Sequence, residues 1–250
     1  MLHINVKKTI SMLFVILLGF SFVISAHAKT YPKRVLSFGA HPDDIEIGCG
    51  GTEKKLINEG YEVYHVYITS GDAGSLKLSK AELSKVREKE AINAGKVLGI
   101  KEVRFLGYPD GIVSFDEKMR AKVINLIREI QPEIIFVHGA SDNFIDHKVV
   151  HNLVVASIKG AAGPWFQETQ GQPWTPRVVY GYEVWDPINA PQAYLDITDS
   201  IDAKVEALEK HVSQVTDTQY HEAFKGLARY RGVMSHGGKY AEAFEIIQSN

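Results

Sequence analysis

The sequence predicts an α/β fold, a Rossmann-like three-layer sandwich with a mostly parallel sheet. Strand-like and helix-like patterns alternate along the first two thirds of the chain, an order that gives parallel strands joined by right-handed crossovers. The chain has 250 residues, of which 45% are hydrophobic and 23% charged, enough for one domain with a full core. No internal repeat, low-complexity tract or linker divides it.

Residues 1–28 have the three parts of a secretory signal peptide. Lys7 and Lys8 precede an apolar run from Ile10 to Ile24, and Ala26-His27-Ala28 provides the small residues of a cleavage site. The run is short for a membrane span, and an uncleaved anchor is the alternative. We therefore expect residues 29–250 to form a single domain that is exported to the periplasm or secreted.

The net charge limits the kinds of binding partner that we expect, and the cysteine content limits the possible disulfide bonds. Residues 1–28 hold two of the 28 basic residues and none of the 30 acidic ones, so the rest of the chain has a formal charge of −4. This balance suggests neither nucleic acid nor an anionic membrane as partner, and no membrane span is expected after signal removal. Cys49 is the single cysteine, so an internal disulfide is excluded and a small packing residue is expected. The oligomeric state stays open.

The first elements follow from their patterns. Residues 35–40 form an apolar run of small and β-branched residues, which predicts a buried strand. A helical pattern from Thr52 to Asn58 ends at a glycine, and Glu62–Thr69 then alternates like a strand. The next helix is expected to begin at an N-cap, Ser79, and to run to Leu98 before Gly99.

The later elements continue this alternation and then become less regular. A third strand, a turn, a helix, a fourth short apolar strand and another helix are followed by a long loop, one more strand and two helices. Their expected bounds are Glu102–Leu106, Tyr108–Gly111, Phe115–Glu129, Ile134–Val137, His147–Ile158, Gly160–Pro176, Val178–Trp185, Ile201–Val212 and Tyr220–Tyr230.

A polar cluster, His41-Pro42-Asp43-Asp44, lies between the first strand and a glycine-rich stretch. In an open α/β sheet this turn lies at the carboxyl end of a strand, where such sheets bind ligands. An imidazole and a carboxylate close together suit Zn²⁺. Two adjacent aspartates repel each other unless a cation intervenes or one is held away. We expect one aspartate to bind metal and the other to act as a base; the alternative is a helix N-cap beside an incidental histidine.

His41-Pro42-Asp43-Asp44, followed by Gly48-Cys49-Gly50-Gly51, resembles the signature of the PIG-L (LmbE-like) zinc-dependent N-deacetylases. The resemblance extends over roughly residues 34–245. It implies a hydrolase that removes an acetyl group from an N-acetylated amino sugar of the N-acetylglucosaminyl type, with Zn²⁺ as cofactor. His41 and Asp44 would be metal ligands and Asp43 the general base. The alternatives are a hydrolase of another amide or ester bond and a non-catalytic secreted carbohydrate-binding protein.

The third ligand is expected from a second polar stretch, residues 138–151, which follows the fourth strand and so faces the first cluster. A catalytic zinc site needs three protein ligands and one open position. In the family, an Asp or Asn directly before a His marks the ligand, and Asp146-His147 matches. His151 is the rival, because residues i and i+4 share a helix face. His138, Asp146 and His151 are otherwise candidates for supporting the ligands or for acting as the acid.

The general acid is unassigned. Family members often carry a histidine three residues before the ligand, and here that position is Phe144. His138 is a candidate for the acid by location only. Arg87 and Asp110 resemble substrate-facing residues of the family more loosely. Asp110 would bond sugar hydroxyls and Arg87 would hold it; the alternatives are a solvated helix arginine and an ordinary turn aspartate.

The long loop Gly160–Pro176 is expected to contact substrate. Loops of this length are often binding loops, and Trp165 and Trp174 offer rings that stack on sugars. The signal peptide implies a substrate outside the cytoplasm, either a small N-acetylated sugar or an oligosaccharide.

Overall fold

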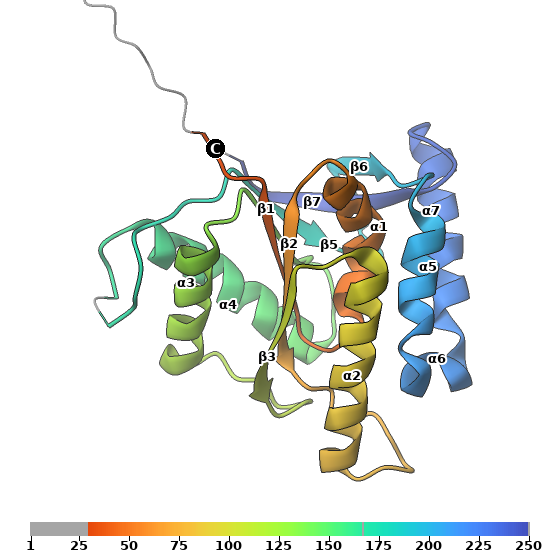
Figure 1. Cartoon of the computed structure of the whole chain (residues 1–250). Helices are drawn as coiled ribbons and strands as arrows, with labels where there is room; N and C mark the ends of the chain where they lie inside the picture. Colours follow the sequence, from red (N-terminus) through yellow and green to blue (C-terminus); the bar gives the residue numbers. More distant parts are fainter. Residues whose placement is uncertain (1–29, 167, 250) are drawn as a thin grey trace, which may run out of the picture. The chain divides into compact units, whose positions relative to one another are not determined.

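The computed structural model describes residues 30–166 and 168–249, and the chain from Tyr31 onward forms one compact unit. The expected signal peptide lies outside the described residues. The centre is a seven-stranded sheet in the order β3-β2-β1-β4-β5-β7-β6 (Figure 1). The strands are β1 (Arg34–Gly39), β2 (Glu62–Thr69), β3 (Glu102–Tyr108), β4 (Ile134–His138), β5 (Val178–Tyr182), β6 (Ala193–Asp196) and β7 (Ala241–Ser249). The helices are α1 (Asp44–Asn58), α2 (Lys80–Leu98), α3 (Glu117–Ile130), α4 (Ile145–Ala162), α5 (Ile201–Glu209), α6 (Val212–Thr218) and α7 (Tyr220–Ser235).

The sheet is mostly parallel, as predicted. Strands β3, β2, β1, β4 and β5 pair in parallel, and β7 runs antiparallel to both β5 and β6. Helices α3 and α4 cover one face, while α1, α2 and α7 cover the other and α5 packs against those three (Figure 1). The predicted three-layer α/β sandwich is therefore confirmed.

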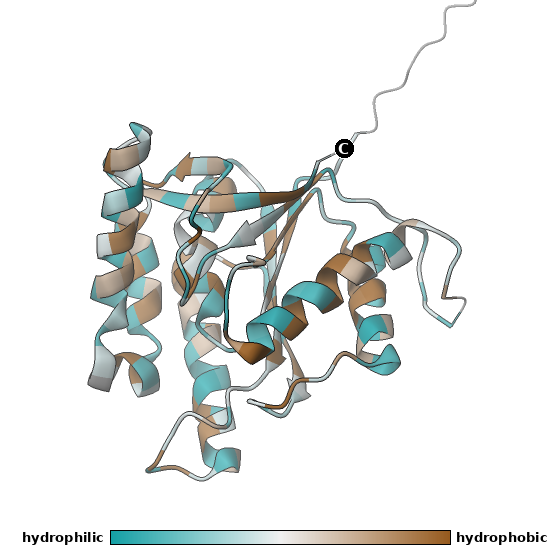
Figure 2. Ribbon diagram, turned by 180° about the vertical axis from the view of Figure 1, so that it is seen from behind, coloured by the Kyte–Doolittle hydropathy of each residue, from teal (hydrophilic) through white to brown (hydrophobic). Residues whose placement is uncertain are grey.

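Side chains alternate between the two faces of the sheet. Leu36 and Phe38 of β1 join the hydrophobic cluster under α3 and α4, whereas Val35 joins the cluster under α1 and α7. Hydrophobic residues accordingly concentrate on the strands and run in stripes along the helices (Figure 2). Cys49 is fully buried in the second cluster, as expected for a packing residue. Among the described residues, no helix is long and apolar enough to cross a membrane.

Helix α2 begins and ends where the sequence predicts. Ser79 caps it, and its hydroxyl accepts a hydrogen bond from the Glu82 amide while the Glu82 carboxylate accepts one from the Ser79 amide at 3.0 Å. This reciprocal pair satisfies two amides that the first turn leaves without partners. Gly99 ends the helix with φ 93°, a left-handed conformation that glycine adopts without strain.

The prediction for α1 was wrong at its start. The helix begins at Asp44 rather than Thr52 and passes straight through the glycine-rich stretch. The glycines are there for packing and not for a turn. A Cβ on Gly48 would overlap the Tyr182 ring, and one on Gly51 would lie 2.8 Å from Ile197 Cδ1. Tertiary packing therefore overrides the weak helix propensity of glycine.

The last third also differs from expectation. The helix expected over Ile201–Val212 is two helices, α5 and α6, and α7 extends five residues beyond the expected Tyr230. Strands β6 and β7 were not predicted. Strand β6 has only four residues, which show too little alternation to be separated from a loop, whereas β7 has nine.

Both ends of the described fold lie at one edge of the sheet. Val35, near the start of β1, is in register with Ile134 at the start of β4, and that row continues through Val178 to Ser249, the end of β7. This is the edge where the parallel strands begin, and Figure 1 shows the C-terminus beside the start of β1. The opposite edge, where the parallel strands end, is free for a site.

Candidate metal centre

The two polar stretches meet at the carboxyl edge of the sheet. His41, Asp43 and Asp44 follow β1 directly, and His147 lies in the first turn of α4, which follows β4. Because β1 and β4 are parallel neighbours, the segments that leave their carboxyl ends lie side by side. The sequence prediction that these stretches face each other agrees with this arrangement.

His41, Asp44 and His147 form a compact group of metal-ligating atoms. His147 Nε2 lies 3.3 Å from His41 Nδ1 and 3.3 Å from Asp44 Oδ1, and His41 Nδ1 lies 3.4 Å from Asp44 Oδ2. Ligands about 2.0–2.1 Å from a tetrahedral zinc ion stand about 3.3 Å apart. The three residues present therefore fit a zinc-sized ion, and all three are buried.

Carboxylates behind the histidines hold their rings in this orientation. Asp142 Oδ2 lies 2.9 Å from His147 Nδ1, and Asp146 Oδ2 and Asp110 Oδ1 lie 3.3 and 3.0 Å from His41 Nε2. Each contact occupies the ring nitrogen that points away from the centre and leaves the other nitrogen facing it. Such partners fix ring orientation and raise ligand basicity.

The charges of the site favour a cation. Burial by itself would raise the pKa of Asp44, but His147, His138 and His41 hold it well below its usual range. In return, and against the effect of burial, Asp44 raises the pKa of His41 well above its usual value and that of His147 to about 9. A metal ion would take the place of these protons, since metal ligands bind in their deprotonated forms.

His138 and His151 lie behind the ligands. His138 Nε2 accepts a hydrogen bond from the Ala40 amide at 3.0 Å and lies 3.3 Å from Asp44 Oδ2. Burial lowers the pKa of His138 to about 4, and the neighbouring His147 adds to this effect. His151 donates from Nδ1 to the backbone oxygen of His138 at 2.7 Å and belongs to none of the ligand groups in the described chain. The arrangement brings His147 to the centre, and not its rival His151.

Asp43 lies beside the ligands but is held separately. Its backbone has φ 120°, unusual for a residue with a side chain, and turns the carboxylate away from that of Asp44. Its Oδ2 accepts a hydrogen bond from the Tyr220 hydroxyl at 2.6 Å and lies 3.2 Å from Arg87 Nη2. Burial raises the pKa of Asp43, and Arg87 opposes that rise. A carboxylate in such a setting suits a general base.

Arg87 does not have the partner that the sequence suggested. It was expected to hold Asp110, but it pairs with Asp43 and donates to the backbone oxygens of Pro42 at 2.6 Å and Gly71 at 3.3 Å. Asp110 instead accepts from the Ala73 amide at 3.1 Å and contacts His41. Both side chains still face the same pocket.

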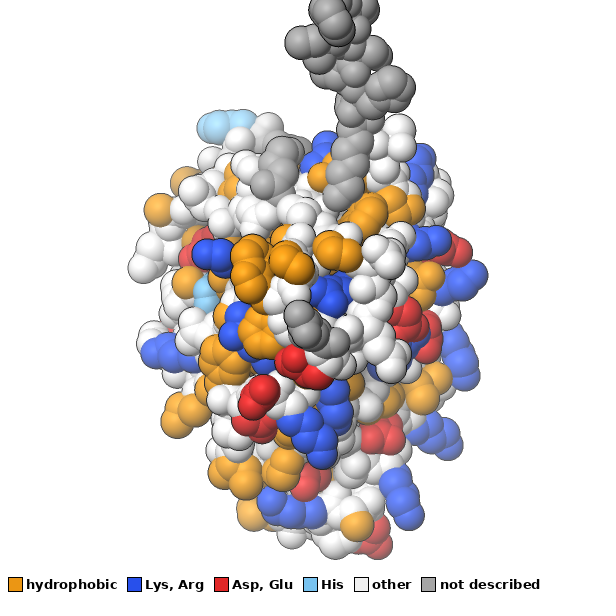
Figure 3. Space-filling model, turned by 90° about the vertical axis from the view of Figure 1, so that its left-hand side faces the viewer, with side chains coloured by type: hydrophobic (Ala, Val, Ile, Leu, Met, Phe, Trp, Pro, Cys, Tyr) orange, Lys and Arg blue, Asp and Glu red, His pale blue; other side chains and the backbone are white. Residues whose placement is uncertain are grey.

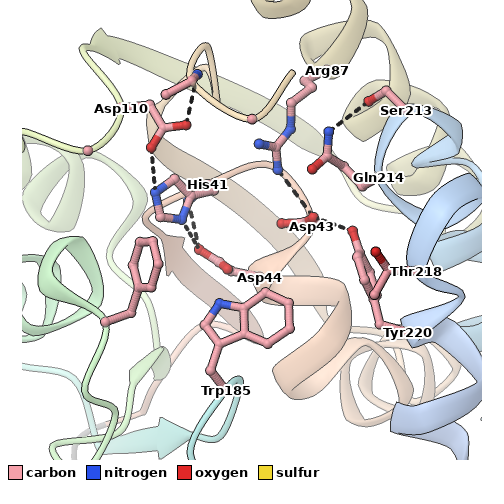
Figure 4. A pocket seen from close by; sticks show the side chains of 14 residues that line it. His41, Asp43, Asp44, Arg87, Asp110, Trp185, Ser213, Gln214, Thr218 and Tyr220 are labelled. Carbon is pink, nitrogen blue, oxygen red and sulfur yellow. Dashed lines mark hydrogen bonds and ion pairs between the residues drawn. The ribbon is translucent and has the colours of Figure 1, made fainter. Parts of the chain in front are cut away.

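A pocket of about 510 Å³ opens over the cluster (Figure 4). Phe144 lines one side and residues of α6 and α7 line the other, and the half-exposed Trp185 lies next to α7, with its ring centroid 5.9 Å from that of Tyr220. The lining residues are His41, Asp43, Asp44, Ala73, Gly74, Arg87, Asp110, Gly111, Phe144, Trp185, Ser213, Gln214, Thr218 and Tyr220. His138 is not among them, which removes the structural support for its candidacy as the acid.

Sequence reasoning missed the second half of this lining. Trp185 follows β5 at the same sheet edge, so the rule that ligands bind at carboxyl ends of strands could have identified it. Gln214 and Tyr220 come from helices whose patterns carry no comparable signal. Phe144 is 46% exposed, and its ring lies edge-on to His41 with centroids 5.5 Å apart, so an apolar ring occupies the place expected for a histidine.

The expected role of the loop Gly160–Pro176 was wrong. Trp174 donates from its indole nitrogen to the Pro132 oxygen at 2.8 Å and packs edge-on against Tyr31. Both partners precede strands, so this loop lies at the amino edge. Helix α4, 18 residues and about 27 Å long, separates it from the centre. Figure 3 views the molecule from this side, where basic, acidic and hydrophobic side chains are interspersed.

Similar proteins are known for most of the described chain. Residues 36–158 match the family model described as PIG-L, GlcNAc-PI de-N-acetylase. The diacetylchitobiose deacetylase of Thermococcus kodakarensis is 27% identical over 227 residues, which cover 86% of this chain and 83% of that protein. The solved N,N'-diacetylchitobiose deacetylase of Pyrococcus horikoshii is 30% identical with a TM-score of 0.78, over 86% of this chain and 84% of that one.

A further solved structure shares the fold. The 4-carboxy-2-hydroxymuconate hydratase of Pseudomonas putida superposes with a TM-score of 0.80, over 87% of this chain and 97% of that one, at 23% identity. At that identity the likeness concerns the fold alone. The family match ends at residue 158, so it includes the candidate ligands and Asp43 but not Trp185 or Tyr220.

Proposed function

The chain belongs to the PIG-L family, and from this we propose that it is a zinc-dependent hydrolase that removes the acetyl group from an N-acetylated amino sugar of the N-acetylglucosamine type. The observation that carries the proposal is the group of His41, Asp44 and His147 at about 3.3 Å spacing, with the carboxylate of Asp43 beside it. Two relatives that align over most of their length are named as deacetylases of diacetylchitobiose.

Each buried group has a task in such a reaction. A zinc ion held by His41, Asp44 and His147 would lower the pKa of water and polarise the acetyl carbonyl. Asp43 accepts the proton of the attacking water, because its raised pKa lets it hold that proton transiently. The proton then passes to the departing nitrogen as the C–N bond breaks. Water and acetamide thus give acetate and an amine with no other reactant.

The absence of a histidine at Phe144 shapes this proposal. Phe144 cannot donate a proton, and Asp110 is occupied by the Ala73 amide and His41. We therefore assign both proton transfers to Asp43, which has one oxygen anchored and the other without a described partner. Its neighbour Arg87 supplies positive charge on the anchored side.

The sugar itself would lie between the two walls of the pocket. A volume of about 510 Å³ is in the range of roughly 300–1,000 Å³ that holds small organic ligands. Trp185 offers an aromatic face for a sugar ring, and Ser213 and Gln214 of α6 offer polar groups in the same pocket. We therefore propose Trp185 for the sugar-stacking role that the sequence had suggested for Trp165 and Trp174.

The choice of zinc needs its own test, because two histidines and one carboxylate also suit non-haem Fe(II). The test is elemental analysis of the protein purified without added metal, followed by chelation and re-addition of Zn²⁺, Fe²⁺ or Co²⁺. We expect one zinc per chain and restoration of activity by zinc. A protein that carries only iron, and is restored only by iron, contradicts the assignment.

The reaction is tested by acetate release from a panel of N-acetylglucosamine, diacetylchitobiose, longer oligomers, O-acetyl esters and non-sugar acetamides. We expect release from the N-acetylated sugars, its loss with a chelator, and a fall of about 10²–10⁴-fold in Asp43→Asn, the usual contribution of a general base. Asp43→Asn should still bind zinc. Release only from esters or non-sugar amides would point to a different hydrolase, and sugar binding without release to a carbohydrate-binding protein.

We also propose that the protein is exported, with residues 1–28 as a signal peptide. The support is the basic start, apolar run and Ala26-His27-Ala28 of the sequence. Fractionation of cells that produce the full chain, with sequencing of the mature N-terminus, is the measurement. A mature chain starting at residue 29 outside the cytoplasm is expected, and a full-length chain in the cytosol contradicts it.

A further inference from the structure

Tyr220 reaches from the C-terminal helices to the candidate base. It is the first residue of α7, and its hydroxyl donates to Asp43 Oδ2 at 2.6 Å (Figure 4). Tyr220 is 8% exposed, and its ring packs in a cluster with Trp185 and Phe224, at centroid distances of 5.9 and 6.1 Å. The aromatic neighbours fix the ring, so the hydroxyl has a fixed position relative to α1.

The orientation of the Asp43 carboxylate depends on residues that are far away in the sequence. Asp43 occupies the N-cap position of α1, yet its side chain makes no capping hydrogen bond to that helix. Its contacts in the described chain are with Arg87 of α2 and Tyr220 of α7, and both use Oδ2. Oδ1 is left to face the pocket.

The contacts from Arg87 and Tyr220 have different effects on the rotation of the Asp43 carboxylate. Arg87 is itself fixed, because it also donates to the backbone oxygens of Pro42 and Gly71. An arginine beside a carboxylate favours a bidentate pair, in which both oxygens face the guanidinium. Rotation of the carboxylate about its last torsion is easy, since that torsion has broad wells. The hydroxyl of Tyr220 opposes this rotation by holding Oδ2.

We propose that Tyr220 is a positioning residue for the base: it holds Oδ2 of Asp43 so that Oδ1 stays directed into the pocket. Its effect on turnover rests on the proposed function, whereas its effect on Asp43 does not. We do not assign Tyr220 as the general acid, because its single hydroxyl proton is directed to Asp43 Oδ2. It lies outside the matched family region, so this support comes from the C-terminal helices of the chain.

The first test is Tyr220→Phe, which keeps the ring and its packing and removes only the hydroxyl. We expect kcat to fall about tenfold to a hundredfold with KM within about twofold, since a misplaced catalytic group can cost that much while substrate binding is kept. Bound zinc should be unchanged. Tyr230→Phe is the matched control, because Tyr230 lies on the same helix and is 56% exposed; it should behave like wild type.

Three outcomes would overturn the inference. An unchanged kcat means that the hydroxyl does not matter to the base. A rise in KM at constant kcat means that Tyr220 binds substrate instead. Loss of zinc means that it supports the metal ligands and not Asp43.

A second test needs no substrate. Thermal unfolding of the zinc-free proteins is compared for wild type, Asp43→Asn, Tyr220→Phe and the double variant. If the two side chains interact, the shift in midpoint of the double variant will differ from the sum of the single shifts. Additive shifts in the unfolding midpoint would contradict the hydrogen bond between Tyr220 and Asp43. If wild type deacetylates nothing, the proposed function fails, and this cycle still decides whether Tyr220 holds Asp43.

Discussion

Asp43 and Asp44 are adjacent in sequence and have opposite surroundings. Asp44 lies among three histidines, which keep it ionised, and Asp43 lies between an arginine and a tyrosine in a site that raises its pKa. The positive φ of Asp43 separates the two carboxylates, and so neighbouring residues of the same type can take different roles. Under the proposed function, one short motif would therefore provide both a metal ligand and a base.

The histidines of α4 permit a direct test of the ligand assignment. Zinc affinity should fall by more than roughly 100-fold in His147→Ala, and by about 10–100-fold in Asp142→Asn, which keeps the ligand but changes the carboxylate that orients it. His151→Ala should keep wild-type affinity, because its described bond is to a backbone oxygen. Competition with a chromogenic chelator measures all three. The assignment is wrong if His151→Ala loses zinc and His147→Ala keeps it.

The site residues that could be predicted are those that lie close together in the sequence or match a short motif. His41, Asp43 and Asp44 lie within four positions after a buried strand, so spacing and chemistry suffice to identify them. Asp146-His147 was identified by resemblance to a family motif. Tyr220 is 177 residues from Asp43 and reaches it only through the packing of α7, which no pattern in a single sequence reports.

Helix α1 shows how packing decides an element. Gly48 faces Tyr182, whose hydroxyl donates to the Phe38 oxygen at 2.7 Å and whose side chain is fully buried. We expect Gly48→Ala to lower the free energy of unfolding by about 1–3 kcal/mol, the usual cost of overpacking, because this ring has no room to move. Urea unfolding of the zinc-free protein measures it.

The matched control is Gly226→Ala on α7. A Cβ at Gly226 would meet nothing within 4 Å, and the residue is exposed. This change should raise the free energy of unfolding by about 0.4–1 kcal/mol, because alanine restricts the unfolded chain. Equal effects of the two substitutions would show that helix propensity, and not the Tyr182 contact, governs these positions.

The same contrast explains which elements could be predicted. Helix α2 carries its own boundaries, a capping box at Ser79 and a terminal Gly99, and its bounds agree with the prediction. The start of α1 depends on Tyr182 and Ile197, which are far away in sequence, so glycines that allow close packing were interpreted as a turn. Strand β7 depends on two partner strands for its place in the sheet.

The candidate metal centre joins the two faces of the sheet. Its candidate ligands come from the segment that leads into α1 and from the start of α4, and these helices cover opposite faces. Zinc at about 100 times its dissociation constant should add about 2.7 kcal/mol to the stability of the fold. For a chain of this size the melting temperature should rise by about 5–10 °C. Calorimetry with and without zinc tests this, and His147→Ala should show no such rise.

The topology was predictable because the βα alternation and the crossover rule leave few arrangements. That topology also brings the strand ends together, so two polar stretches about 100 residues apart could be expected to meet. The placement of the long loop could not be predicted in the same way. Its partners, Pro132 and Tyr31, become apparent only once the strands are assembled.

The position of the two chain ends bears on how the protein can be attached to a surface. A tether joined before residue 31 or after residue 249 leaves from the edge where the strands begin, on the far side of the sheet from His41 and Trp185. A bead or a fusion partner attached at that edge would therefore leave the mouth of the pocket uncovered. Attached at either end, the molecule would therefore present its pocket to the solution and not to its own support.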